Sequence, residues 1–141
     1  MTEPHSPRMF VNLPVKDLPA TMAFFSHLGF RFEPRFTNDK AACMVISEWN
    51  YAMLLTEPFF QGFTAKAICD SATSTEVLIA LSMESRARVD EMAALALEAG
   101  GKVEDAPKDY GFMYQRAFQD PDGHNWEVFF MEPAAAEGDH G

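Results

Sequence analysis

The sequence predicts an α+β fold in which two βαβββ modules form a curled mixed sheet with the helices on its convex face. Three observations carry this prediction. Residues 9–15 alternate between two faces, as residues of a strand do. A segment with helical periodicity follows, and three more extended segments follow the helix. The same order of elements begins again at residue 76, so the chain is a degenerate repeat.

The first predicted strand, MFVNLPV, has two unlike faces. Its aliphatic face is expected to pack against the helices and carries Val11, Leu13 and Val15. Phe10 and Asn12 lie on the opposite face, which is left open. Because Pro14 has no N–H to donate, the strand is expected to run at the edge of its sheet or to end there.

The rest of the first module is expected to end near residue 57. Asp17 is a good helix N-cap, and Gly29 stands where a left-handed residue ends a helix. Apolar residues recur between them at helical spacing: Leu18, Met22, Phe25 and Leu28. Strands are predicted over about 30–36, 41–47 and 51–56, and the first module therefore spans residues 9–57.

Residues 58–75 carry Pro58 and Gly62 and break every period, which predicts a linker with a short helical piece. The second module is expected over residues 76–133, and the two modules together form one domain. It has a strand at 76–83, a helix capped by Ser85 and ended by Gly100, and strands at Val103, 112–118 and 124–131. Residues 134–141 are expected to be a flexible tail.

The composition narrows the functional classes. A net charge of −10 disfavours nucleic acid as a partner and permits a cationic or neutral ligand. The two cysteines make no disulfide framework. No run approaches the ~20 apolar residues that a membrane-spanning helix needs. A soluble cytoplasmic protein without membrane contacts is the expectation.

The stretch DPDGHNWEVFF at 120–130 predicts a hairpin whose second strand directs Asn125 and Glu127 to one face. His124 and Trp126 lie on the other face, where a solvated or capping role is expected for His124. A three-residue loop with a glycine bulge would set Ala117 opposite Glu127. A register shifted by one residue would instead bring Arg116 opposite Glu127, as a plain ion pair across the strands. Both registers stay open at this point.

Three stretches carry a resemblance to a known family: LPVKDLPATMAFFSHLGF at 13–30, TEVLIALSM at 75–83 and FQDPDGHNWEVFF at 118–130. Over 9–133 the chain resembles the vicinal oxygen chelate superfamily, which includes glyoxalase I, bleomycin resistance proteins, fosfomycin resistance enzymes and extradiol dioxygenases. Within it, the chain looks closest to bacterial glyoxalase-family proteins labelled predicted lactoylglutathione lyase. The resemblance implies a symmetric homodimer.

Metal-dependent members of that superfamily hold one divalent ion with four side chains, two from each module. Carried over by position, the four fall on Phe10, Leu54, Leu78 and Glu127, and a shift of one residue would replace Leu54 by Met53 or Leu55. Phenyl and isobutyl groups donate no electron pair to an ion. The resemblance therefore implies a fold without the usual metal site, and we expect no cofactor.

The open face is then expected to be a pocket for a small organic molecule. Its apolar wall comes from Phe10, Leu54, Leu78 and Met113, and its polar points are Asn12, Gln115, Asn125 and Glu127. Three functions fit this description. The first is metal-free binding of a small molecule, and the second is a glyoxalase-like lyase or isomerase with Glu127 as catalytic base or partial metal ligand. The third is a structural dimer whose cup is plugged by its own side chains, with Phe59, Phe60 and Phe63 as candidates.

Overall fold

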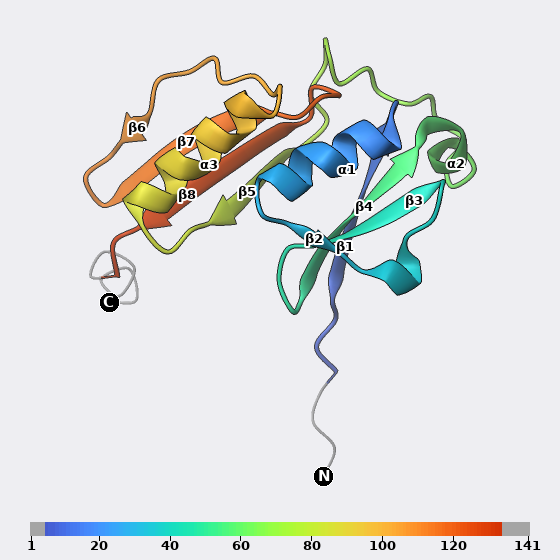
Figure 1. Cartoon of the computed structure of the whole chain (residues 1–141), viewed down its shortest axis with the longest axis horizontal. Helices are drawn as coiled ribbons and strands as arrows, with labels where there is room; N and C mark the ends of the chain where they lie inside the picture. The colour runs from blue at the N-terminus through green and yellow to red at the C-terminus, as the bar shows by residue number, and fades with distance from the viewer. Residues whose placement is uncertain (1–4, 134–141) are drawn as a thin grey trace. The chain divides into compact units, whose positions relative to one another are not determined.

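A computed structural model describes residues 5–133 of the chain (Figure 1), so the tail expected over 134–141 lies outside the described residues. Two compact units divide between Ile68 and Cys69, within the segment expected to be a linker. Each unit contains one four-stranded mixed sheet and one long helix. The predicted α+β class and the repeat of βαβββ modules are confirmed.

The sheet of the first unit has the strand order β1-β4-β3-β2, with β1 parallel to β4 and the other pairs antiparallel. The strand that contains Pro14 lies at the edge, as that residue predicts. The elements are β1 (Met9–Val15), α1 (Leu18–His27), β2 (Arg31–Phe32), the 3₁₀ helix η1 (Pro34–Phe36), β3 (Ala41–Val45), β4 (Asn50–Thr56) and α2 (Glu57–Gln61).

Helix α1 covers one face of this sheet and contacts β3 and β4. The Ala20 N–H donates to Asp17 Oδ1 at 3.0 Å, which confirms Asp17 as the N-cap. At the other end, Gly29 has a φ of 101°, a conformation that glycine adopts without steric cost. The buried face of the helix carries Leu18, Thr21, Phe24 and Phe25.

The strand predicted over 30–36 is wrong beyond Phe32. Strand β2 has two residues, and a 3₁₀ helix begins at Pro34. Proline has no N–H for a strand ladder, and its fixed φ suits the first position of a helical turn.

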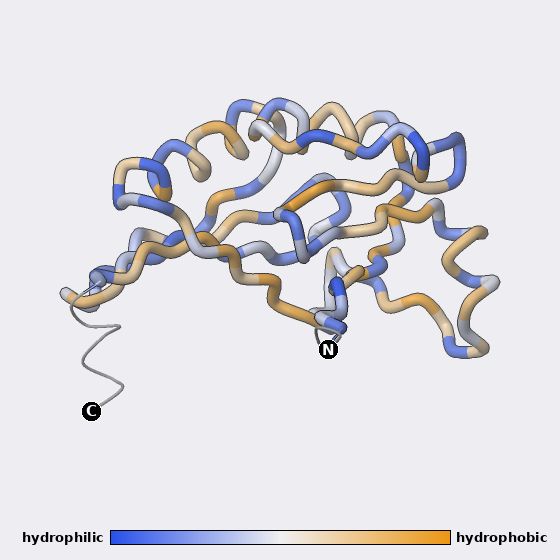
Figure 2. The backbone as a smooth tube through the Cα atoms, turned by 90° about the horizontal axis from the view of Figure 1, so that it is seen from below, coloured by the Kyte–Doolittle hydropathy of each residue, from blue (hydrophilic) through white to orange (hydrophobic). Residues whose placement is uncertain are grey.

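The second unit repeats the topology with the strand order β5-β8-β7-β6, in which β5 is parallel to β8. Its elements are β5 (Leu78–Ser82), α3 (Arg86–Glu98), β6 (Lys108–Asp109), β7 (Met113–Gln119) and β8 (Asn125–Met131). Ser85 caps α3 by accepting the Arg88 N–H at 3.0 Å. The predicted inner face of α3 is buried, namely Val89, Met92, Ala93 and Ala96, and the helix contacts β7 and β8. Figure 2 shows hydrophilic and hydrophobic residues alternating along the helices, as amphipathic packing requires.

The strand predicted at Val103 is wrong. Only Lys102 pairs with β7 there, through an isolated bridge to Gln119, and β6 begins at Lys108, which pairs with Gln115. Five residues (103–107) therefore lie opposite three (116–118), so this segment contains two extra residues. The extra length and Pro107, which has no N–H to donate, prevent a continuous ladder.

Within residues 5–133, no helix combines the length and the apolar composition that crossing a membrane requires.

Candidate functional site

The hairpin between β7 and β8 has the first of the two predicted registers. Ala117 lies opposite Glu127, and Arg116 lies opposite Val128. The Asp120 N–H donates to the His124 carbonyl at 3.1 Å, and Gly123 has a φ of 87°, as expected for a loop with a glycine bulge. Arg116 Nη1 lies 3.6 Å from Asp90 Oδ1, on the side of α3. The alternative ion pair between Arg116 and Glu127 is therefore wrong.

This register gathers five of the predicted site residues on one face of the second sheet. Residues directly opposite one another in a sheet share a face. Leu78 pairs with Asn125, Ala80 with Glu127, and Ala117 with Glu127 from the other side. Trp126 and Val128, which alternate with these residues on β8, are fully buried on the other side. The face away from α3, called here the open face of the second unit, thus carries Leu78, Met113, Gln115, Asn125 and Glu127.

Glu127 is half-buried in the middle of this open face. Its two paired neighbours, Ala80 and Ala117, have short side chains that leave the carboxylate accessible. Within the described residues the carboxylate of Glu127 has no hydrogen bond and no ion pair. Asn125 beside it is held in place, because its Nδ2 donates to Thr75 Oγ1 at 3.0 Å. An accessible carboxylate without a protein partner can accept hydrogen bonds from a ligand.

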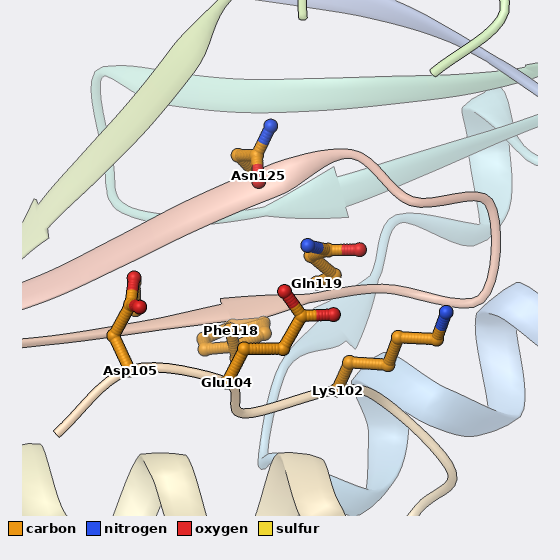
Figure 3. A pocket seen from close by; sticks show the side chains of 7 residues that line it. Lys102, Glu104, Asp105, Phe118, Gln119 and Asn125 are labelled. Carbon is orange, nitrogen blue, oxygen red and sulfur yellow. The ribbon is translucent and has the colours of Figure 1, made fainter. Parts of the chain in front are cut away.

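Two small cavities lie along this face, beside the segment 102–108. The first is a shallow hollow with about 260 Å³ of non-atom space, open solvent included, and is lined by Lys102, Glu104, Asp105, Ala117, Phe118, Gln119 and Asn125 (Figure 3). The second has about 280 Å³ of non-atom space, open solvent again included, and is lined by Asp105, Ala106, Lys108, Gln115, Arg116, Ala117 and Glu127. Glu127 and Gln115 therefore line one cavity, and Asn125 lines the other.

In the first unit, Phe10 and Asn12 lie on the face away from α1, as predicted. Phe10 is 48% exposed, and its ring stacks on Tyr51 with centroids 4.8 Å apart and an angle of 11° between the planes. Asn12 Nδ2 donates to the Phe10 carbonyl at 3.4 Å. The open face of the first unit is therefore an aromatic surface with one amide beside it.

The prediction that Leu54 lines the open face is wrong. Leu54 is fully buried and pairs with Leu13 and Ala42, which are also buried. Met53 occupies the open face instead, opposite Asn12. The repeat gives the same answer, because Asn12 opposite Met53 corresponds to Ala80 opposite Glu127. Because side chains alternate along a strand, an error of one residue in the alignment places the side chain on the wrong face of the sheet.

Placing Met53 instead of Leu54 on the open face changes the set of possible metal donors only slightly. The positions that correspond to the superfamily's ligands become Phe10, Met53, Leu78 and Glu127. A thioether is a soft, weak donor, suited to Cu(I) rather than to Mg²⁺ or Zn²⁺. A divalent ion would still find a single carboxylate among these four side chains.

Sequence reasoning missed a second group of ionisable residues, on the turn before β8. One ligating atom from each of Asp120, Asp122 and His124 lies within 4.8 Å of the others, a spacing that could hold an ion. Asp120 Oδ1 accepts the N–H groups of Asp122 and His124, both at 3.0 Å, and Oδ2 accepts Trp126 Nε1 at 3.1 Å. Asp120 thus fixes the turn with three of the roughly four acceptor sites of its carboxylate.

His124 also lies in this group and is only 8% exposed, so of the solvated or capping roles expected for it the solvated one is wrong. The reason is the alternation along β8, which directs His124 to the same side as the buried Trp126. The sequence signal for this group was the motif Asp-Pro-Asp-Gly-His-Asn-Trp, in which the first Asp precedes a turn whose N–H groups it can accept.

Asp120→Asn is expected to lower the free energy of unfolding by about 2 kcal/mol, because the amide nitrogen would face the indole N–H and leave a buried donor without an acceptor. Urea unfolding measures the change, with Asp39→Asn on the surface as the control. An equal effect of the two substitutions would contradict the role of Asp120.

The pH dependence tests the same group separately. Burial raises the pKa of Asp120 above its ordinary value, although the nearby His124 lowers it. The folded chain therefore binds this proton at a higher pH than the unfolded chain, so this group adds stability as the pH falls toward 4. The stability difference between the wild type and Asp120→Asn is expected to widen over that range.

The fold and site define a class of protein: a pair of βαβββ modules, each with a helix on one face of its sheet, with an accessible carboxylate on the other face of the second sheet. Comparison with known proteins is consistent with this class. The sequence profile of the Glyoxalase/Bleomycin resistance protein/Dioxygenase superfamily matches residues 9–128. The chain belongs to this superfamily.

Three solved structures show the same fold. A hypothetical protein from S. aureus is 27% identical with a TM-score of 0.76, over 90% of this chain and 95% of that one. A glyoxalase/bleomycin resistance protein/dioxygenase family enzyme from Burkholderia phytofirmans is 16% identical with a TM-score of 0.74, over 89% and 99%. A glyoxalase-related enzyme from Fulvimarina pelagi is 20% identical with a TM-score of 0.73, over 86% and 85%. No curated protein matches the sequence.

Proposed function

We propose that the chain binds a small organic molecule on an open sheet face, with Glu127 as the main polar contact and without the superfamily's divalent ion. The observation that carries the proposal is the half-buried carboxylate of Glu127, which has no partner among residues 5–133 and lines a cavity with Gln115. An accessible carboxylate that no protein group bonds can exchange its hydrating water for the donor groups of a ligand.

The neighbouring side chains suit an organic ligand better than an ion. Leu78 is 58% exposed, and Met113 lies on the same face. Gln115 and Asn125 supply amide groups that can both donate and accept hydrogen bonds. An apolar surface with a few polar groups is the usual composition of a small-molecule site.

Charge favours a cationic or neutral ligand over an anion. The carboxylate of Glu127 accepts hydrogen bonds and attracts an ammonium or guanidinium group. The net charge of −10 adds a weaker, long-range attraction in the same direction.

The plugged cup has less support from the described residues. Phe63 is 72% exposed, and Phe59, against whose ring it packs with centroids 5.2 Å apart, is 37% exposed. Rings exposed to this extent do not fill a cavity, and of the three candidates Phe60 alone is half-buried. We retain the homodimer as a proposal, to be measured by sedimentation equilibrium.

Glu127→Gln is expected to weaken binding of the ligand by about 10- to 100-fold, because a hydrogen bond to a charged group contributes about 1.5–3 kcal/mol. The ligand is first found by thermal shift with small amines, neutral metabolites and antibiotics, since a ligand of the folded state raises the melting temperature. Titration calorimetry then compares the wild type with the variant. Glu98→Gln is the matched control, because it removes the same charge from α3, on the other side of the sheet.

Two results would overturn the proposal. If Glu127→Gln keeps the affinity for a compound that the wild type converts but abolishes turnover, Glu127 is a general base and the chain is a lyase or isomerase. If zinc or nickel titration finds one tight site that Glu127→Gln removes, the metal-free part is wrong.

A further inference from the structure

The segment 102–108 lies beside β7 but is paired with it only at its two ends. Lys102 and Gln119 exchange two backbone hydrogen bonds, at 3.1 and 2.8 Å, and Lys108 pairs with Gln115. The segment between these points is two residues longer than the part of β7 that it passes. It therefore bows away from the strand at Ala117.

The bow leaves a backbone donor and a backbone acceptor of β7 without partners. Both backbone groups of Gln119 point toward Lys102, and the groups of a strand point the same way at every second residue. The N–H and C=O of Ala117 therefore point toward the bowed segment. No residue in the described part of the chain bonds to them. Half-buried backbone groups of this kind require water or a ligand.

Ala117 also lines both cavities of this face, as does Asp105, so the two cavities adjoin. Figure 3 shows the side chains of Glu104 and Asp105 extending from the segment toward the sheet. The second cavity is lined by charges of both signs: Lys108 and Arg116 with Asp105 and Glu127. Arg116 is engaged by Asp90 at 3.6 Å, on the side of α3. The side chains of Lys108, Asp105 and Glu127 form no ion pair with any residue between 5 and 133.

We propose that this second cavity binds a small zwitterion of the α-amino acid type. This inference rests on the proposed function and names the ligand class for the same site. Asp105 and Glu127 hold the ammonium group, and Lys108 with the Ala117 N–H holds the carboxylate. A purely cationic ligand would leave Lys108 and the backbone N–H unused, and a purely anionic one would meet two carboxylates.

The number of hydrogen-bond acceptors in the cavity also matches such a ligand. An ammonium group has three protons to donate, and Asp105, Glu127 and the Ala117 C=O are three acceptors. The amide of Gln115, which lines the same cavity, is free to contact the ligand's side chain.

The test uses titration calorimetry with the full chain and four probes. These are glycine, leucine, phenylalanine and arginine, each also as its N-acetyl derivative and as its methyl ester. We expect at least one free amino acid to bind. Acetylation, which removes the ammonium charge, and esterification, which removes the carboxylate, are each expected to weaken binding by about tenfold or more.

Two variants assign the ends of the ligand. Lys108→Gln is expected to weaken binding of the amino acid by about tenfold but to leave its methyl ester unaffected. Glu127→Gln is expected to weaken binding of the amino acid and of its methyl ester, and to leave binding of the N-acetyl derivative unaffected. Lys102→Gln is the matched control, since it removes the same charge from a residue that lines only the first cavity.

The outcomes separate this inference from the proposed function. A ligand that depends on Glu127 but is indifferent to Lys108→Gln, with no affinity for any free amino acid, overturns the zwitterion and leaves the proposed function standing. The absence of any ligand that depends on Glu127 overturns both.

Discussion

Leu54→Ala is expected to lower the free energy of unfolding by about 3 kcal/mol, whereas Met53→Ala is expected to cost less than about 1 kcal/mol. Leu54 is fully buried between Leu13 and Ala42, on the face that α1 covers, and truncation would leave a cavity there. Met53 lies on the opposite face and is only half-buried, so the same truncation removes little contact.

Urea unfolding followed by circular dichroism measures both variants, and they form a matched pair because the two residues are neighbours on one strand. Equal losses of stability would mean that β4 presents its residues in a different register.

Gly123→Ala is expected to lower the free energy of unfolding by about 3 kcal/mol or more. Two causes add. The φ of 87° is unfavourable for any residue with a Cβ. A Cβ at this position would also lie 2.7 Å from the Ser71 carbonyl oxygen and 3.1 Å from the Ala72 Cα, so backbone would have to move.

Gly111→Ala is the control for the cost of a positive φ. Gly111 has a φ of 83°, but an added Cβ would meet nothing within 4 Å, so only the conformational cost of about 1 kcal/mol remains. Fluorescence of the fully buried Trp126 reports unfolding of the second unit when Trp49, in the first unit, is replaced by Phe in every variant. A Gly123→Ala protein no less stable than Gly111→Ala would exclude the close approach of the 71–72 backbone.

Most of the fold could be predicted because its signals are local. Alternation, helical periodicity, the caps at Asp17 and Ser85 and the glycine stops each depend on a few neighbouring residues. The strand at Val103 failed for the opposite reason, whereas the one at 30–36 carried a local signal for its end, Pro34. Where the chain leaves a ladder depends on the length of the strand opposite, and no local pattern shows the two extra residues between Lys102 and Lys108.

The site residues also divide into those that a local pattern places and those that only tertiary packing places. Alternation along the predicted strand placed Asn125 and Glu127 on one face from the sequence, whereas Gln115 depended on a register that the sequence left open and the structure decides. Leu54 could not, because its neighbours Met53 and Leu55 are equally apolar and nothing in the sequence distinguishes the two faces of that strand. The role of Asp120 depends on burial, which only tertiary packing reveals.

The bowed segment has a consequence for how this scaffold can be varied. Because β7 and β8 pair through a register of their own, from Met113 opposite Met131 to Gln119 opposite Asn125, changes in residues 103–107 do not touch the hydrogen bonds of that ladder. Editing these five residues would therefore reshape the proposed ligand site without altering the hairpin that carries Glu127.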